Sequence, residues 1–252
     1  MKEIVKLIIL SHKRANKVDT LDTISNCSLC IPENQADEYR EHNPNVEIIE
    51  HPNTIIGLSA KMKWVHQNYP NCVMLDDDLN AMCRTFVDKE FDEKFRVDKD
   101  TAYDILQSTA FTAREAGCMM FGFSNTARPV DYSAMKPLSM TGFAIGGSMG
   151  FFEGFKMDKL PNECISACDF FVSGISAHFH RKCFINRRYA FTSKEGTFTS
   201  TGGMADLRTL ETERHDYFLL KEYFGDAIQR KKNTSMRKSL QNEYERTLRI
   251  PF

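Results

Sequence analysis

The sequence contains no long hydrophobic run, although apolar residues make up 42% of its 252 positions. A membrane-spanning helix needs about 20 consecutive apolar residues, and the run in "VKLIIL" near the start covers only a few. The first residues also lack a small-residue cleavage site, so they indicate a first β-strand rather than a signal peptide. We therefore expect a cytoplasmic protein.

The chain also has no excess of charge of one sign. Its 33 Lys and Arg against 34 Asp and Glu give a formal net charge of −1. This balance argues against a protein that is basic all over, so a polyanionic partner would have to meet a local patch. The length suits one large α/β domain, and 19 Phe with 8 Tyr can fill a substantial core.

Several catalytic and metal-binding motifs are missing. The sequence has no Gly-x-Ser-x-Gly elbow, no Walker loop and no Gly-x-Gly-x-x-Gly after the first strand. Cys27 with Cys30, and Cys164 with Cys168, have close spacing, but neither pair has a second half-site. We interpret the eight cysteines as structural or incidental free thiols in a reducing compartment.

Apolar runs alternate with segments of helical periodicity along the first half of the chain. This alternation is typical of βαβ units with a parallel sheet. A further segment, residues 175–191, has a strand-like pattern. We expect strands over residues 5–10, 28–33, 46–52, 72–77 and 118–124, and helices over 15–24, 34–44, 56–70, 98–117 and 214–225. The fold class is therefore α/β, with a mixed, mostly parallel sheet flanked by helices.

Three aspartates, Asp76, Asp77 and Asp78, follow the fourth expected strand, and no positive residue near them in the sequence offsets their charge. Ligands of open α/β sheets bind beyond the carboxyl ends of strands, and carboxylate oxygens suit Mg²⁺ and Mn²⁺. In strand geometry Asp76 and Asp78 point to one side and Asp77 to the other. Asp77 could nevertheless replace either one, because the register is open. The alternative is a solvated acidic turn.

The order of four strand–helix elements followed by Asp-x-Asp resembles the GT-A glycosyltransferases. More narrowly, the pattern "LSHKRA", "LDDDL", "GGSMG", "DFFVS" and "TGGM" is similar to the TET-associated glycosyltransferases of bacteriophages. The resemblance implies a GT-A (Rossmann-like) fold and a nucleotide-sugar donor, with a UDP-sugar favoured, held through Mn²⁺ or Mg²⁺. It implies transfer of a hexose or pentose to a hydroxymethylated pyrimidine, such as hydroxymethylcytosine, in phage DNA, within the host cytoplasm.

The resemblance also implies a division of the single domain, 1–252. Residues 1–125 would bind the nucleotide sugar, 126–225 would form the acceptor half, and 226–252 would be a basic tail. The donor-binding residues would be Ser11, His12, Lys13, Arg14, Asp76, Asp77, Gly146 and Gly147. The polar residues could instead belong to an ordinary loop, and the two glycines to a tight turn.

For the metal, the resemblance implies Asp76 and Asp78, with His215 completing the shell. His178 and His180, which alternate along a predicted strand and so share one face, are its rivals. A lone histidine is more often a structural group. Asp169 is the candidate base for the acceptor hydroxyl. It could equally be an N-capping or salt-bridged residue before "FFVSGI".

Two clusters of basic residues bear on the acceptor. They contain Arg181, Arg187 and Arg188 in one segment, and Lys231 and Lys232 in another. Such groups can bind a DNA backbone by displacing its counterions, and the modified base could be reached by base flipping. A solvated surface is the alternative interpretation.

Two other functions stay open: a GT-A enzyme with a protein or glycan acceptor, and a non-catalytic nucleotide-binding module.

Overall fold

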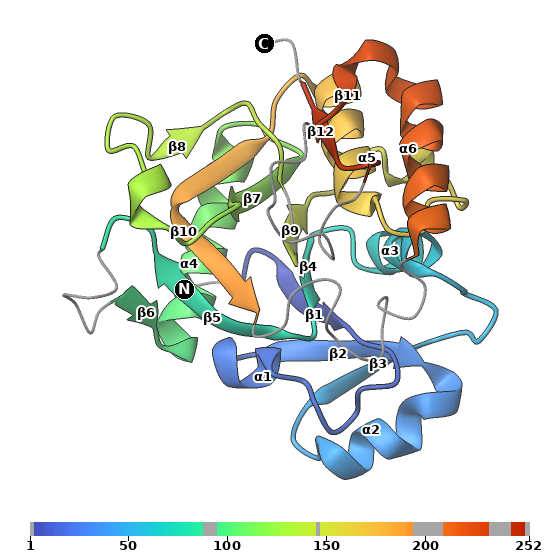
Figure 1. Ribbon diagram of the computed structural model, residues 1–252. Coiled ribbons are helices and arrows are strands. Elements are labelled where there is room, and N and C mark those ends of the chain that lie inside the picture. Colours follow the sequence, from blue (N-terminus) through green and yellow to red (C-terminus); the bar gives the residue numbers. More distant parts are fainter. Residues whose placement is uncertain (1–2, 88–94, 145–146, 194–208, 232–242, 250–252) are drawn as a thin grey trace.

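The computed structural model describes residues 3–87, 95–144, 147–193, 209–231 and 243–249. Ten strands form one mixed sheet in the order β3-β2-β1-β4-β9-β7-β10-β5-β6, with β8 paired to β10 (Figure 1). The strands are β1 Lys6–Leu10, β2 Cys27–Pro32, β3 Glu47–His51, β4 Cys72–Asp76, β5 Leu79–Arg84, β6 Arg96–Val97, β7 Met120–Ser124, β8 Leu138–Ser139, β9 Ser148–Phe151 and β10 Phe184–Ser193. The helices are α1 Thr20–Thr23, α2 Ala36–His42, α3 Leu58–Asn68, α4 Lys99–Glu115, α5 Cys168–Ile175 and α6 Leu210–Phe224. A two-stranded sheet of β11 (Ile228–Arg230) and β12 (Arg246–Leu248) lies beside α6.

The strands β3, β2, β1 and β4 run parallel to one another. Strand β9 enters antiparallel between β4 and β7, and β10 runs parallel to β7. The predicted α/β class, with a mixed sheet flanked by helices, is confirmed. Because β9 pairs with β4, a strand from the second half of the chain lies directly beside the strand that ends at Asp76.

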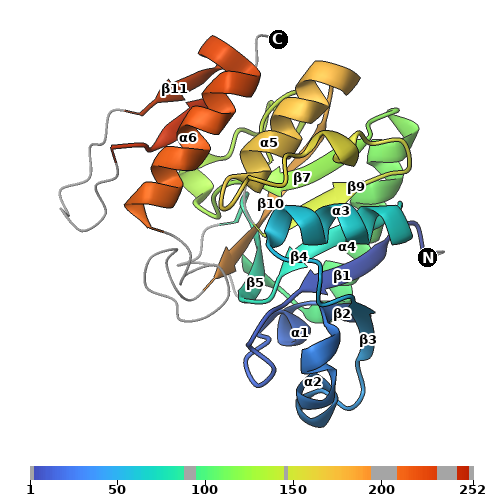
Figure 2. The same cartoon turned by 90° about the vertical axis from the view of Figure 1, so that its right-hand side faces the viewer.

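Two hydrophobic cores cover the two faces of the sheet. Successive side chains of a strand point to opposite faces, so Ile8 packs toward α3 and α5 while Leu7 packs toward α2 and α4. Figure 2 shows α3 and α5 on the same face of the sheet. Strand β4 ends at Asp76, so this alternation reaches the first aspartate of the triplet and no further.

Helix ends follow the local signals in the sequence. The Asp98 side chain accepts a hydrogen bond of 2.9 Å from the Thr101 N–H and so caps α4. Gly117, with a φ of +68°, allows the chain to leave this helix. Both features confirm the predicted limits of the helix. No helix in the described parts of the chain is long and apolar enough to cross a membrane.

Two predicted elements were wrong. The helix expected over residues 15–24 is reduced to the single turn α1. The strand expected over 175–191 begins only at Phe184, because the preceding residues form the end of α5 and a π-helical turn, η5 (Ser176–His180). The buried residues Cys168, Phe171, Val172 and Ile175 have helical spacing, which explains the helix.

The cysteines are free thiols, as predicted. The Cys164 and Cys168 sulfurs lie 3.6 Å apart at the start of α5, and both side chains are buried. The hydrogen bond to Cys164, together with burial, raises the pKa of the Cys168 thiol well above its ordinary value. Thiols of this kind are poor nucleophiles, which fits a structural role.

Candidate active site at the carboxyl end of strand β4

The Asp77 side chain is buried, and its negative charge is balanced by Arg14. It is 6% exposed, its Oδ2 accepts a 2.6 Å hydrogen bond from Ser11 Oγ, and its Oδ1 accepts one of 2.7 Å from Arg14. The Tyr39 hydroxyl lies 2.7 Å from Ser11 Oγ and accepts a hydrogen bond from the Arg14 N–H. The cation that offsets the triplet therefore comes from 63 residues upstream. Three predicted donor contacts, Ser11, Arg14 and Asp77, form a buried network that fixes the loop after β1.

Asp76 and Asp78 are more accessible than Asp77. Asp76 is the last residue of β4 and is exposed, whereas Asp78 lies in the turn after the strand, is partly exposed and is 3.7 Å from Arg14. The predicted strand alternation therefore does not extend through the triplet, because β4 ends at Asp76. Surrounding protein atoms raise the pKa of Asp76 to about 7, and repulsion by Asp78, Asp77 and Asp169 adds to this effect while Arg14 opposes it. The Asp76 side chain still reaches solvent, so the protein crowds the carboxylate rather than enclosing it. Burial and Asp77 also raise the pKa of Asp78.

Asp169 is brought to the same site from a distant part of the chain. It lies in the first turn of α5, is partly buried, and is close enough to Asp76 to raise that residue's pKa by charge repulsion. Its Oδ1 accepts a 2.9 Å hydrogen bond from the Phe170 N–H. The N-cap of α5 is Ala167, so the N-capping interpretation of Asp169 was wrong. A carboxylate at this end of a helix is favoured by the helix dipole.

The turn before Asp169 is held by a buried residue that the sequence analysis missed. Asp216 on α6 is fully buried, and its carboxylate accepts hydrogen bonds from the backbone N–H groups of residues 165, 166 and 167 at 2.6–3.1 Å. It also accepts a bond of 2.9 Å from the Ser166 hydroxyl. Asp216 thus satisfies the buried N–H groups of the turn that leads into α5. No sequence pattern links these two helices.

Gly147 lies against Asp76. Its carbonyl accepts a 2.8 Å hydrogen bond from the Asp76 N–H, and a Cβ atom at Gly147 would come within 2.6–2.8 Å of the Asp76 side chain. Gly147 therefore leaves room for the Asp76 carboxylate, and its predicted contact with the donor stays a prediction. Gly146, the other predicted glycine, lies outside the described residues.

Gly147→Ala is expected to push the Asp76 carboxylate out of position. If Asp76 binds a divalent cation, metal affinity should fall by roughly 10- to 100-fold, as for other residues that orient metal ligands. Titration of Mn²⁺ into the variant by calorimetry measures this effect. Ser148→Ala is the control, since its side chain points to the opposite face of β9 and has no hydrogen-bond partner among the described residues. Unchanged Mn²⁺ affinity in Gly147→Ala would contradict the assignment of Asp76 to the metal.

The carboxylates fit a divalent cation held mainly by two protein ligands. Mg²⁺ is commonly bound through one or two carboxylates, with waters and substrate phosphates as the other ligands. Repulsion within the cluster also favours a cation there. Among the described residues, no group of three His, Cys, Asp or Glu side chains is arranged to hold a metal ion, so Asp76, Asp78 and His215 do not form one. His215 on α6 instead pairs with Asp216 at 3.2 Å.

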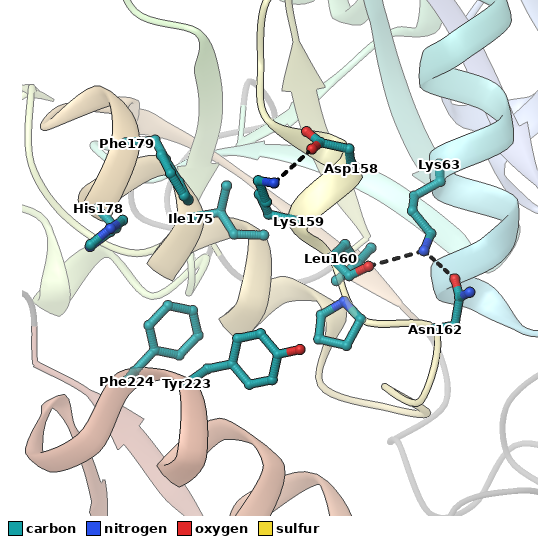
Figure 3. A pocket seen from close by; sticks show the side chains of 11 residues that line it. Lys63, Asp158, Lys159, Leu160, Asn162, Ile175, His178, Phe179, Tyr223 and Phe224 are labelled. Atoms are coloured by element: carbon teal, nitrogen blue, oxygen red, sulfur yellow. Dashed lines mark hydrogen bonds and ion pairs between the residues drawn. The ribbon is translucent and has the colours of Figure 1, made fainter.

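His178 and His180 lie in η5, not on a strand, so they do not share a strand face. His180 stacks on the Phe155 ring, and its Nε2 accepts a weak hydrogen bond from the Lys156 N–H. His178 lines a pocket of about 460 Å³, which is also lined by Lys63, Phe179 and Tyr223 (Figure 3). None of the three aspartates of the triplet lines this pocket, and neither does Asp169, so it is a separate feature.

Lys61 is a second residue that the sequence analysis missed. It shares the buried side of α3 with Met62 and Val65, and its Nζ donates a 2.7 Å hydrogen bond to the Ser11 carbonyl oxygen. Burial lowers the pKa of Lys61 to about 8. Its charge also lowers the pKa of His12 and His51, after the larger effect of burial on each. Lys61 therefore gives the carboxyl ends of β1 and β3 a positive charge opposite the aspartates.

The remaining predicted residues lie on the surface. His12 and Lys13 are exposed in the loop after β1. Arg187 and Arg188 are exposed on β10, and Arg181 is exposed just after η5. Lys231 is exposed and pairs with Glu245 at 3.3 Å. Lys232 lies outside the described residues.

A Rossmann-like sheet with paired carboxylates at the end of β4, and a third carboxylate facing them, is the arrangement expected of a GT-A glycosyltransferase. The family model for TET-Associated Glycosyltransferase matches residues 5–139, just over half of the 252 residues. The chain belongs to this family of glycosyltransferases. No protein with a curated description matches it. The matched range contains Arg14, Lys61 and the aspartate triplet, whereas Gly147 and Asp169 lie beyond it.

Proposed function

We propose that this glycosyltransferase moves a sugar from a nucleotide sugar, with a UDP-sugar favoured, to the hydroxyl of a hydroxymethylated pyrimidine in DNA. The observation that carries the donor side is the pair of solvent-facing carboxylates, Asp76 and Asp78, at the carboxyl edge of a parallel sheet. This edge is where open α/β sheets bind nucleotides. The acceptor is supported by family membership and by the exposed arginines of β10.

Asp76 and Asp78 would hold Mn²⁺ or Mg²⁺, which stabilises the negative charge of the departing nucleoside diphosphate. The protein's own part is to fix these carboxylates. Asp77, bonded to Ser11 and Arg14, anchors the middle of the triplet, and Gly147 leaves room for Asp76. Lys61 places a positive charge at the base of the loop after β1, where it favours an anionic donor.

Asp169 would act on the acceptor. Its carboxylate takes the proton of the acceptor hydroxyl as the oxygen forms a bond to the anomeric carbon of the sugar. The bond between this carbon and the diphosphate oxygen breaks, and the nucleoside diphosphate leaves. Because Asp216 fixes the turn before α5, it also helps to position Asp169 in the first turn of that helix.

Incubation of the protein with a panel of nucleotide sugars, Mn²⁺ or Mg²⁺, and hydroxymethylcytosine DNA tests this function, with nucleoside mass spectrometry as the readout. A sugar-modified nucleoside supports the proposal. If nucleotide sugars are hydrolysed without any transfer to DNA, the acceptor is a protein or a glycan instead. If a nucleotide sugar is bound but not consumed, a non-catalytic nucleotide-binding module becomes the better interpretation.

The exposed arginines give a separate prediction about DNA. Replacing Arg187 and Arg188 with Ala should weaken DNA binding about equally for all sequences, because phosphate contacts carry little sequence information. The slope of log affinity against log salt should become shallower by roughly 0.9 for each duplex phosphate that the variant no longer neutralises. Fluorescence anisotropy at several salt concentrations measures both effects. The matched control replaces Lys99 and Arg114, two exposed cations of α4. An unchanged slope in the β10 variant would count against binding of DNA by these arginines.

A further inference from the structure

Three aromatic rings meet on the surface where β5 and β10 lie side by side. Phe86, just after β5, is 45% exposed. Its ring centre lies 6.0 Å from that of Tyr132 and 6.2 Å from that of Tyr189, which belongs to β10. We call Phe86, Tyr132 and Tyr189 the aromatic platform. Figure 1 shows β5, β10 and β8 together on the side of the molecule away from α6.

Arginines border the aromatic platform. The Arg188 guanidinium carbon lies 5.6 Å from the centre of the Tyr189 ring, and Arg187 is exposed beside it. Both sit where the pairing of β10 with β7 shifts register, between Asn186 and Ala190. A large ring left in water beside cations is typical of a binding surface rather than of a core.

The backbone of these arginines is fixed rather than loose. Thr85 donates hydrogen bonds from its hydroxyl to the Arg187 carbonyl at 2.6 Å and from its N–H to the Arg188 carbonyl at 2.9 Å. Asn186 Oδ1 accepts a 3.1 Å bond from Arg188 Nε. The cations are thus pre-positioned next to the rings, which lowers the cost of ordering them on binding.

We propose that the aromatic platform stacks unpaired bases of the DNA strand that carries the acceptor, with Arg187 and Arg188 on the adjacent phosphates. This inference rests on the proposed DNA acceptor. Flat rings interleaved with cations suit a strand with exposed bases and a charged backbone, whereas an acidic peptide has no flat groups to stack. Strand β5 leads from Asp78 to the platform over about six residues, or roughly 20 Å. The platform therefore holds nucleotides that flank the reacting one, and the acceptor base is presented from an unpaired strand.

The test compares a single-stranded oligodeoxynucleotide with the same strand made abasic at every position, with fluorescence anisotropy as the readout. The wild-type protein should prefer the normal strand, and Phe86→Ala should lose this preference, with binding reduced roughly 5- to 150-fold, the range for one base stack. The salt slope should stay unchanged in Phe86→Ala, because no cation is removed from the phosphates. Phe86→Leu keeps the apolar bulk and should also lose the preference, so a folding defect cannot account for the result.

Phe111→Ala is the matched control, since Phe111 is 48% exposed on α4 and is not one of the three rings of the platform. It should retain the preference for the normal strand. Equal binding of normal and abasic strands by the wild-type protein would overturn the platform, and so would stronger binding of an acidic peptide such as polyglutamate. Either result leaves the proposed DNA acceptor standing if sugar is still transferred to DNA. Absence of transfer to DNA, by contrast, would remove the acceptor as well.

Discussion

The protein with both Asp76→Asn and Asp78→Asn is expected to lose sugar transfer entirely while remaining folded. Both side chains reach solvent, and the hydrogen bonds of Asp77 to Ser11 and Arg14 do not involve them. The double variant removes the ion pair between Asp78 and Arg14 at 3.7 Å, but Arg14 keeps its closer partner, Asp77, at 2.7 Å. Burial, and after it repulsion within the cluster, raises the pKa of Asp76, which means that its charged form is disfavoured in the folded protein. Neutral amides should therefore leave the melting temperature equal or higher.

The measurements are transfer from nucleotide sugars, Mn²⁺ titration by calorimetry, and thermal unfolding. Asp77→Asn is the matched control within the same triplet, and it should have the opposite effect on stability. Asp77 is buried and paired with Arg14, so its loss should destabilise the fold by about 1–3 kcal/mol. Full activity of the double variant, or undiminished transfer by the wild-type protein in excess chelator, would rule out the metal role of Asp76 and Asp78.

Local patterns in the sequence were sufficient for much of the fold. The buried strands and the long helix α4 have strong periodicity, and Asp98 and Gly117 mark the helix ends. The pattern failed where aromatic and apolar residues are dense. Within the strand predicted over 175–191, residues 175–180 instead end α5 and form η5, and the burial of Phe171 and Ile175 at helical spacing accounts for this.

For the candidate site, too, some features could be predicted from the sequence and others could not. The place of the triplet at the carboxyl end of β4 follows from the apolar run before it, although Asp77 and Asp78 lie in the turn after the strand. The partners of these residues do not follow from the sequence, because they arrive by pairing between distant strands and helices. Arg14 neutralises Asp77 across 63 residues, and Asp216 caps the turn before Asp169 from another helix. Such contacts have no signature in a single sequence, since nothing in the chain near one partner specifies the other.

Asp169→Asn is expected to cut turnover by about a hundredfold or more, with donor binding close to normal. The variant removes the group that takes the proton of the acceptor hydroxyl and leaves the carboxylates of Asp76 and Asp78 in place. An asparagine oxygen can still accept the Phe170 N–H, and Asp216 still holds the turn before α5, so the fold should persist. If Asp169 had only a structural role, Asp169→Asn would lower the stability of the fold and leave the turnover per folded molecule unchanged.

Three measurements separate these outcomes for Asp169: steady-state kcat with saturating acceptor, the Kd of the donor nucleotide by calorimetry, and the melting temperature. Glu163→Gln is the control, because it removes an exposed carboxylate from the same segment of the chain. It should change none of the three. A drop in kcat confined to Asp169→Asn, with Kd and melting temperature preserved, is the result expected of a base. Loss of donor affinity would instead place Asp169 with the metal ligands, because its charge already acts on Asp76. Unchanged kcat would leave the acceptor hydroxyl without a base at this end of α5, and the start of the helix would then serve only to pack the sheet.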